Sequence, residues 1–269
     1  CPAAFGLVFA APVGRAEARP IAAGSVMKLR DQAYQRFTRG LLKREIRSGQ
    51  FVSQRELALI TGMTLGAIRE LIPRLEADGL IRTAPQRGMQ VAQVDVSLIR
   101  NAFQFRLMLE REAAALFAEH APTAEFDRLQ QAHEAVLATA ATTVSPALIE
   151  RAQAVDDAMH AAIVDSLHNE IVSNAYRINS IKIRLIRQEQ TRLDATLVVP
   201  VMREHLKIIA ALRTRDPVRA AAAIGDHITA ARNRALGLPT PDLRAPAARN
   251  DDVTTIKRAS ARGNRGGAR

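Results

Sequence analysis

The sequence predicts a mainly α-helical fold with two domains, a small N-terminal one that carries a β-hairpin and a larger C-terminal bundle made only of helices. The 269 residues are enough for two small domains, each with its own core. Aromatic residues make up 4% and tryptophan is absent, so the cores must be built from Ala, Leu, Ile and Val. Runs of β-branched residues are short, which favours helix packing over a large sheet.

The N-terminal domain is expected to open with two helices. Apolar residues recur at three- and four-residue steps from Arg30 to Arg47, and Gly49 ends this pattern. Ser53 is a good N-cap, and Glu56 three residues later completes a capping box. We therefore expect a long first helix over Arg30–Arg47 and a short second one over Gln54–Ile60.

A third helix and a hairpin follow. Gly62 breaks the chain, and Thr64 can cap a helix that continues to Glu76, although Pro73 inside it is awkward. Two short apolar or alternating segments then predict a hairpin. These segments are Leu80–Thr83 and Gln90–Val94, with a turn at Pro85–Gly88. Helix, break, helix and glycine-bearing hairpin form the layout of a winged helix-turn-helix, which places its second helix in the major groove of DNA.

The chain beyond Asp95 is expected to be helical, with caps and breakers such as Pro122 and Asp216 between segments. The expected helices are Val96–Glu119, Thr123–Thr139, Ser145–Leu167, Asn169–Arg192, Val199–Arg213 and Asp216–Leu236. We divide the chain into an extension without regular structure (1–26), a winged helix-turn-helix domain (27–94), a helical domain (95–238) and a basic disordered tail (239–269). Ala3–Val13 is mildly apolar, but no basic region precedes it, so we interpret it as an upstream extension and not as a signal peptide. Met27 is a candidate natural start.

The charge and the cysteine content restrict the partners and the compartment. The net charge is +11, and residues 28–92 hold twelve Lys and Arg against six Asp and Glu, which suits nucleic acid among other acidic partners. Cys1 is the one cysteine, so a disulfide framework within the chain and a cysteine zinc site are excluded, as suits a reducing cytosol. No apolar run approaches the roughly 20 residues of a membrane helix, so no membrane partner is expected.

One stretch of the first domain carries a specific combination of motifs. It reads SQRELALITGMTLGAIRELIPRLEADGLI, followed by RTAPQRGMQV. The order Ser-x-Arg-x-Leu-Ala, a Gly-hydrophobic-Thr turn, an Arg in the next helix, Leu-x-x-x-Gly-Leu and a wing with Gly resembles the GntR family of transcriptional regulators. The resemblance implies that the protein binds double-stranded operator DNA in the cytoplasm, at the nucleoid.

The resemblance also implies which residues contact DNA. Arg55 corresponds to an arginine that positions the backbone, and Thr64 begins the helix whose N-terminus meets a phosphate. Arg69 corresponds to the arginine that points at a guanine, a contact worth roughly 1–3 kcal/mol of discrimination. The remaining implied contacts are Leu65, Gly66 and the wing tip at Arg87 and Gly88. Leu65 stands where the family often has arginine, and the usual Pro-Gly before Ser53 is absent, which leaves the operator sequence open.

The helical domain contains candidate metal ligands. Asp156 and His160 are four residues apart on one helix and therefore project from the same face. His205 and His227 lie on two later helices rich in Ala, Ile and Leu. A single histidine there is more often a core residue than a ligand, but three histidines and one aspartate on three helices of one bundle favour a divalent ion. The donor set suits Zn²⁺, Ni²⁺, Mn²⁺ or Fe²⁺ without distinguishing them.

Residues 95–236 resemble the FCD effector domain of the FadR-type branch of that family. The motifs are FRLMLEREAAALFAEHA at the opening, Asp-x-x-x-His followed nine residues later by Asn169, and two histidines 22 residues apart. The resemblance implies that Asp156, His160, His205 and His227 bind one metal and that a small carboxylate or sugar-acid effector binds beside it. Arg106 and Asn169 are the expected effector-binding residues.

These observations predict a ligand-responsive regulator, most simply a repressor, that binds a palindromic operator as a homodimer and is not an enzyme. Two other classes stay open. A three-His, one-Asp site could activate water in a metal-dependent hydrolase, which turnover on small esters would reveal. A non-specific DNA-binding protein would show a steep salt dependence and little preference for any sequence.

Overall fold

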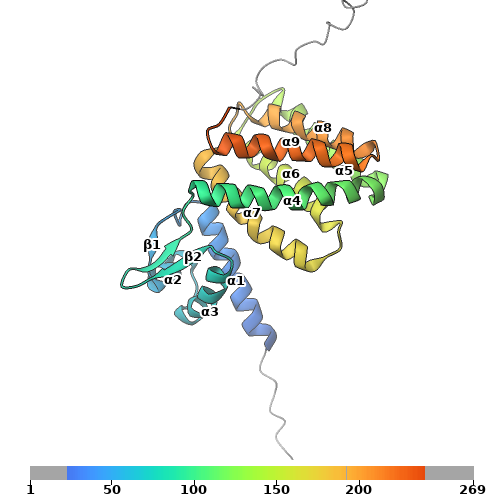
Figure 1. The fold of residues 1–269 in the computed structure, drawn as a ribbon. Coiled ribbons are helices and arrows are strands. Elements are labelled where there is room, and N and C mark those ends of the chain that lie inside the picture. The colour runs from blue at the N-terminus through green and yellow to red at the C-terminus, as the bar shows by residue number, and fades with distance from the viewer. Residues whose placement is uncertain (1–22, 192, 240–269) are drawn as a thin grey trace, which may run out of the picture. The chain divides into compact units, whose positions relative to one another are not determined.

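The computed structural model describes residues 23–191 and 193–239, which divide into two compact units at Ala92–Gln93 (Figure 1). The first unit combines three helices with three short strands. Its elements are α1 (Ala23–Leu42), β1 (Phe51–Val52), α2 (Gln54–Thr61), α3 (Leu65–Ala77), β2 (Ile81–Ala84) and β3 (Gly88–Val91). The expectations for residues 1–22 and 240–269 lie outside the described residues.

The helix-turn-helix of the first unit is set by its caps. Ser53 and Glu56 form the reciprocal capping box at the start of α2, as predicted. Gly62 ends α2 in the left-handed region with φ of 62°, which glycine adopts without steric cost. Thr64 then accepts a hydrogen bond from the backbone of Ala67 and begins α3. Helix α3 continues through Pro73, whose exposed ring lies on the solvent side.

The three strands form an antiparallel sheet in the order β1-β3-β2, with Ala84 paired to Gly88 at the turn. The predicted hairpin is present, but β1 was missed because two residues are too few to show an alternating pattern. Gly88 brings β3 against β1. Its φ is +86°, and a side chain there would place Cβ 2.8 Å from the carbonyl oxygen of Val52.

The first helix differs from the prediction. It begins at Ala23 and ends at Leu42, whereas the apolar period predicted Arg30–Arg47. The chain leaves the helix because Arg44 takes a left-handed conformation, and the backbone amides of Glu45 and Ile46 turn back to the carbonyl of Gly40. Ile46 is still buried, so the apolar pattern continues for one turn beyond the helix.

The second unit is an all-helical bundle. Its helices are α4 (Val96–His120), α5 (Thr123–Ala140), α6 (Pro146–Asp165), α7 (Glu170–Gln190), α8 (Val198–Arg213) and α9 (Pro217–Ala235). All six predicted helices are present, and no end differs from the prediction by more than two residues. Helix α4 packs along α9 and also contacts α6, α7 and α8, while α5 packs on α6 and α8.

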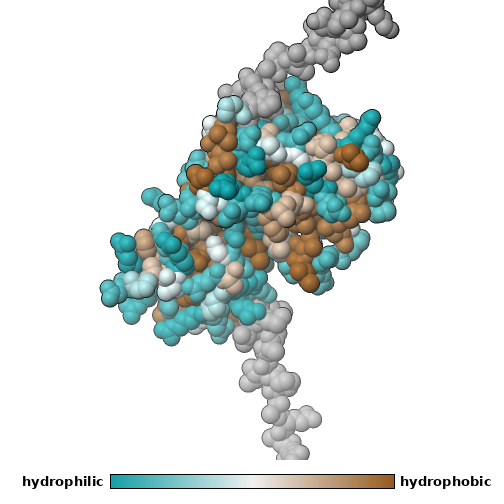
Figure 2. All heavy atoms as spheres, in the orientation of Figure 1, coloured by the Kyte–Doolittle hydropathy of each residue, from teal (hydrophilic) through white to brown (hydrophobic). Residues whose placement is uncertain are grey.

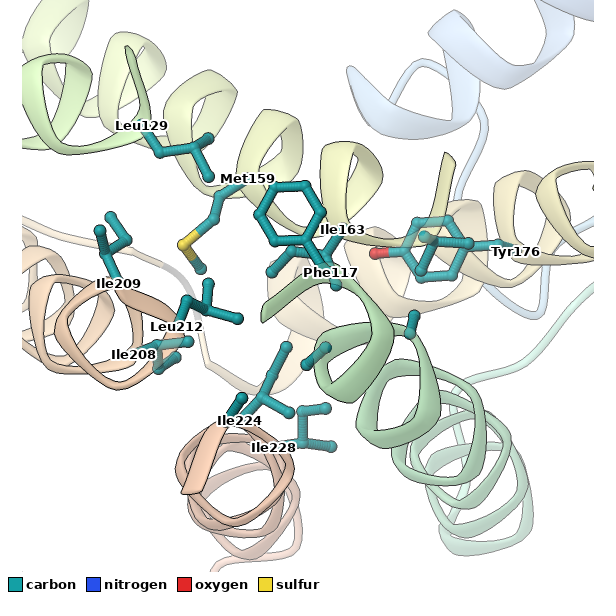
Figure 3. Packing of buried hydrophobic residues seen from close by; sticks show 14 of the residues in the cluster. Phe117, Leu129, Met159, Ile163, Tyr176, Ile208, Ile209, Leu212, Ile224 and Ile228 are labelled. Atoms are coloured by element: carbon teal, nitrogen blue, oxygen red, sulfur yellow. The ribbon is translucent and has the colours of Figure 1, made fainter. Parts of the chain in front are cut away.

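The core of this unit is aliphatic with few rings, as the composition predicts. Figure 3 shows Phe117 of α4, Met159 and Ile163 of α6, and the isoleucines of α8 and α9 pointing into one shared interior. The face that Figure 2 shows is mostly hydrophilic, with apolar patches. Met108, Ile171 and Val218 are among its exposed apolar side chains. Within the described residues, no helix is long and apolar enough to span a membrane.

The close approach at Gly88 gives a first prediction. Gly88→Ala should destabilise the first unit by about 1 to 3 kcal/mol, because the new Cβ meets Val52 and the positive φ is strained for alanine. Gly66→Ala is the matched control, since its nearest neighbouring atom is 3.9 Å from the new Cβ and its φ is not positive. Thermal unfolding of both variants checks this. Equal melting temperatures for the two would contradict it.

Candidate functional site

The residues implied to contact DNA are all exposed in the first unit. They lie on the first turn of α2 (Arg55), the start of α3 (Thr64, Leu65, Gly66 and Arg69) and the hairpin tip (Arg87 and Gly88). The Nε of Arg69 donates a hydrogen bond to Gln54 at 3.3 Å, which joins the starts of α2 and α3. Thr64 caps α3 through its hydroxyl oxygen, and its hydroxyl hydrogen remains available for another acceptor.

Two contacts hold the hairpin beside these helices. The guanidinium of Arg87 lies over the ring of Phe51, 4.8 Å from its centroid, so the arginine at the tip is braced against β1. Glu76, near the end of α3, accepts hydrogen bonds from the backbone and hydroxyl of Thr83 on β2. Since β1 leads directly into α2, one continuous surface contains the hairpin tip and the starts of α2 and α3.

Four buried side chains of the second unit converge on one point. Asp156 and His160 come from α6, His205 from α8 and His227 from α9, and one ligand atom from each lies within 4.8 Å of the others. Asp156 Oδ1 is 3.3 Å from His160 Nε2 and 3.4 Å from His205 Nε2. These three atoms and His227 Nε2 have no hydrogen-bond partner among the described residues. The structure therefore brings together all four residues that the sequence singled out.

Each histidine of the cluster is held through its other nitrogen. His160 Nδ1 is 2.6 Å from Glu110 of α4, and His227 Nδ1 is 3.1 Å from Glu204 of α8. His205 Nδ1 is 3.2 Å from the Nε2 of His133, a buried residue of α5. A carboxylate only accepts hydrogen bonds, so the Nδ1 atoms of His160 and His227 donate and their Nε2 atoms face the cluster.

The carboxylates of Asp156, Glu110 and Glu204 each form an ion pair with an arginine, and the first two are buried while the third is partly buried. Arg187 of α7 pairs with Asp156, Arg106 of α4 with Glu110, and Arg234 of α9 with Glu204. Burial alone raises the pKa of Glu110, but Arg106 and His160 lower it to about 2. Burial also raises the pKa of Asp156, whereas Arg187 and the histidines bring it well below its usual range. Both carboxylates are therefore ionised near neutral pH.

The three histidines differ in basicity. Burial, followed by repulsion from neighbouring cationic groups, places the pKa of His227 well below its ordinary value. Burial does the same to the pKa of His205, and Asp156 offsets it only in part. Burial and Arg106 also lower the pKa of His160, but Glu110 and Asp156 raise it more, and the net shift is upward. His205 and His227 are therefore neutral near pH 7, while His160 binds a proton more readily.

Two small cavities adjoin the cluster. One, of about 50 Å³, is lined by Asp156, His227, Arg187 and Arg234 together with apolar side chains. The other, of about 10 Å³, is lined by His160, Arg106, Tyr176, Ser180 and Arg187 among others. Arg187 borders both cavities.

The two expected effector-binding residues differ in burial and in their position relative to the cavities: Arg106 lines one, and Asn169 lines neither. Arg106 is buried against Glu110 and borders the smaller cavity, and its Nη1 has no partner among the described residues. Asn169 is exposed, and its side chain accepts hydrogen bonds from Ile171 and Val172 as the N-cap of α7. It borders neither cavity.

The cluster fits a divalent metal ion. Three imidazole nitrogens and a carboxylate oxygen are donors that first-row transition metals accept. Four buried donor atoms without partners would each carry an energetic cost unless something binds them, and a cation placed among them interacts with all four. Histidine Nδ1 atoms bonded to carboxylates or other acceptors are usual for metal-binding imidazoles.

Sequence reasoning missed most groups around the ligands. His133 lies on the buried stripe of α5 with Phe126, Leu129 and Val136, a spacing that indicates the core and gives no sign of His205, which is 72 residues away. Glu204, Arg187 and Arg234 likewise contact partners on helices other than their own, namely His227, Asp156 and Glu204. The four-residue spacing of Arg106 and Glu110 was the one signal available, since it predicts contact on one helix face.

Comparison with known proteins supports both units. Residues 101–230 match the FCD domain family. The chain is 28% identical over 196 residues to the Glc operon transcriptional activator of Escherichia coli K12, covering 65% of this chain and 76% of that protein. It is 25% identical over 206 residues to the HTH-type transcriptional repressor RspR of the same strain, covering 73% of this chain and 84% of that protein.

Solved structures share the fold. A transcriptional regulator, GntR, from Rhodococcus sp. RHA1 matches with a TM-score of 0.63 at 14% identity, over 80% of this chain and all of that one. E. coli McbR/YncC matches with a TM-score of 0.57 at 18% identity, over 76% and 93%. The fold is thus a winged helix-turn-helix joined to an all-helical bundle, and the relatives are regulators of transcription, not enzymes. Residues 101–230 therefore form an FCD domain, and the chain as a whole is similar to transcriptional regulators that include members of the GntR family.

Proposed function

We propose that this regulator binds a palindromic operator as a homodimer and senses a small carboxylate or sugar acid through a divalent metal ion in its helical unit. Asp156, His160, His205 and His227 hold the ion. The observation that carries the proposal is the convergence of four buried donor atoms, each without a partner among the described residues. The proposed place of action is the cytoplasm, at the nucleoid.

Charge balance supports an anionic effector. Three carboxylates and three arginines surround the cluster, and their charges cancel when the histidines are neutral. A divalent ion then adds two positive charges in a buried place, where an unbalanced charge is costly. A carboxylate bound beside the ion reduces that excess, and Arg187 and Arg234 border the larger cavity in which it would lie. The volume of this cavity, about 50 Å³, favours an acid of few carbon atoms unless side chains move.

The proposed response is a shift between arrangements of the bundle. An effector that prefers one arrangement changes the separation of the two DNA-reading units in a dimer, and therefore the affinity for the operator. Phe105 and Met108 are exposed neighbours on one face of α4 and are candidates for the two-fold interface. We propose that the regulator represses transcription. Among the relatives, one is named as an activator and another as a repressor.

The proposed DNA contacts follow from the exposed surface of the first unit. The start of α3 presents Thr64, Leu65, Gly66 and Arg69 to the major groove, and Arg55 contacts the backbone. The hairpin tip reaches the adjacent groove, and Phe51 limits the freedom of Arg87 before DNA binds. Arg106 remains a proposed effector-binding residue. Asn169 is the N-cap of α7, so replacing it would affect the site only by destabilising the start of that helix.

A metal-binding experiment tests the proposal. The wild-type protein should take up one divalent ion per chain from Zn²⁺, Ni²⁺, Mn²⁺ or Fe²⁺, and Asp156→Asn should lose it because the amide no longer supplies an anionic ligand. Metal analysis after dialysis gives the stoichiometry. Thermal shift should show stabilisation by metal, about 2.7 kcal/mol at a hundredfold excess over Kd. A panel of short carboxylic and sugar acids should then stabilise the metal-loaded protein further.

Asp127→Asn is the control for this experiment. Asp127 is an exposed residue of α5 paired with Arg213, so the change removes the same charge far from any ligand. The control should bind metal as the wild type does. If the wild type binds none of the four ions, or if Asp156→Asn binds as tightly as the control, the metal site is wrong.

The pKa shifts predict how metal affinity depends on pH. An imidazole must be neutral to bind metal, and the raised pKa of His160 means that a proton competes there at a higher pH than at an ordinary histidine. His205, His227 and Asp156 have lowered pKa values and add no proton in the same range. Affinity should therefore fall about tenfold per pH unit as the pH drops below the pKa of His160. Chelator competition at several pH values measures this, and a slope of three protons would contradict it.

DNA binding gives a further prediction. Arg69→Ala should lower discrimination at one base pair of each half-site by roughly 1–3 kcal/mol, while Arg87→Ala should weaken binding to most sequences. Fluorescence anisotropy with a palindromic site near the gene, competed by random DNA, separates the two effects. Arg128→Ala is the control, because it removes one charge from an exposed ion pair in the helical unit. An equal loss in this control would mean that net charge alone drives binding.

A further inference from the structure

His205 differs from the other two histidines of the cluster in what holds its Nδ1 atom. Glutamates fill that role for His160 and His227, but His205 faces the imidazole of His133, which is fully buried on α5. An imidazole can either donate or accept, so this contact does not by itself state where the proton lies. The second nitrogen of His133 settles the question.

His133 Nδ1 lies 2.7 Å from the backbone carbonyl of Leu129, one helical turn earlier. A carbonyl oxygen accepts and never donates, so His133 Nδ1 carries the hydrogen. His133 is fully buried, and among the described residues its two nitrogens contact the Leu129 carbonyl and the His205 ring, so no carboxylate pairs with a charged form of this ring. The ring is therefore neutral, and its Nε2 carries no hydrogen. That Nε2 can therefore only accept, and the hydrogen between the two rings must belong to His205 Nδ1.

We propose that His133 is a positioning residue that holds His205 as the Nδ1–H tautomer, so that the lone pair of His205 Nε2 faces Asp156, His160 and His227. The inference rests on the proposed metal site for its purpose, but the tautomer is a property of the protein without metal. The chain of contacts runs from the Leu129 carbonyl through His133 to His205 and involves only neutral groups. It thereby links α5, which contributes no ligand, to the ligand on α8.

An imidazole at position 133 accepts the hydrogen bond of His205 without adding a buried charge. A third glutamate at this place would have no nearby arginine, because Arg106, Arg187 and Arg234 already pair with Glu110, Asp156 and Glu204. It would bury an uncompensated negative charge. A neutral acceptor fixes the ring of His205 at a smaller electrostatic cost, and it leaves that ring less basic than a carboxylate would.

The tautomer can be observed directly. Selective ¹⁵N-histidine labelling of the metal-free full-length protein, with long-range ¹H–¹⁵N spectra, distinguishes Nδ1–H from Nε2–H rings. The wild type should show His205 as Nδ1–H. His133→Leu removes the acceptor, and His205 should then shift toward Nε2–H, where it can donate to Asp156. His133→Gln keeps an acceptor at a similar reach and should retain the wild-type tautomer. A wild-type His205 in the Nε2–H form would overturn the inference.

Metal affinity provides the second readout. With Co²⁺ as the probe, His133→Leu should bind about 10- to 100-fold more weakly than the wild type and show an altered visible spectrum, while His133→Gln recovers most of the affinity. His120→Gln, at an exposed position on α4, should change nothing. Equal affinity in the Leu variant and the wild type would refute the role of His133.

If circular dichroism shows that the Leu variant does not fold, His133→Asn, which is too short to reach His205, replaces it in the comparison with His133→Gln. A wild type with the expected tautomer that takes up no metal would refute the proposed metal site and leave the role of His133 standing.

Discussion

Asp156 and Glu110 are buried, and Glu204 is partly buried, in a bundle interior otherwise filled by aliphatic side chains, where an unpaired charge costs several kcal/mol. The structure meets this constraint with arginines from three different helices, α4, α7 and α9. Two of these pairs cross between helices, Arg187 of α7 with Asp156 of α6 and Arg234 of α9 with Glu204 of α8, whereas Arg106 and Glu110 lie one turn apart on α4. Since apolar packing tolerates sliding more readily than a directional ion pair does, the two interhelical pairs help to fix the register of the helices around the cluster.

The histidines extend this constraint through their two nitrogens. Each Nε2 faces the shared point, and each Nδ1 contacts a residue on another helix, so the orientation of one ring depends on two helices. Glu110 and Arg106 lie on α4, which begins at Val96, a few residues after the boundary between the two units. The proposed response would therefore reach the helix that is covalently closest to the first unit. The contacts that satisfy the buried charges would themselves carry the proposed coupling.

Sequence patterns predicted what local rules determine. The six helices of the bundle and the capping box at Ser53 and Glu56 depend on spacing within one segment, and they are found as expected. The end of α1 was misplaced because Ile46 continues the apolar pattern after Arg44 has left the helix. The four candidate ligands were predicted through resemblance together with helical spacing, and the structure brings them together, while their role in metal binding stays a prediction. His133, Glu204 and Arg187 were missed because their partners lie far away in sequence, and only the packing of the bundle brings them together.

The charge balance also predicts that binding of the proposed ion and binding of the proposed effector depend on each other. Without an ion, the arginines and carboxylates already neutralise one another, and an anion entering the larger cavity meets Arg187 while Arg187 is still bound to Asp156. In the proposed function, an ion held by Asp156 would take up part of the charge of that carboxylate, and Arg187 would then be a better partner for an incoming acid. Each of the two proposed ligands would thus lower the cost of binding the other. Such coupling is reciprocal. An acid that binds at this cluster must therefore raise the affinity for metal by the same factor by which metal raises the affinity for the acid.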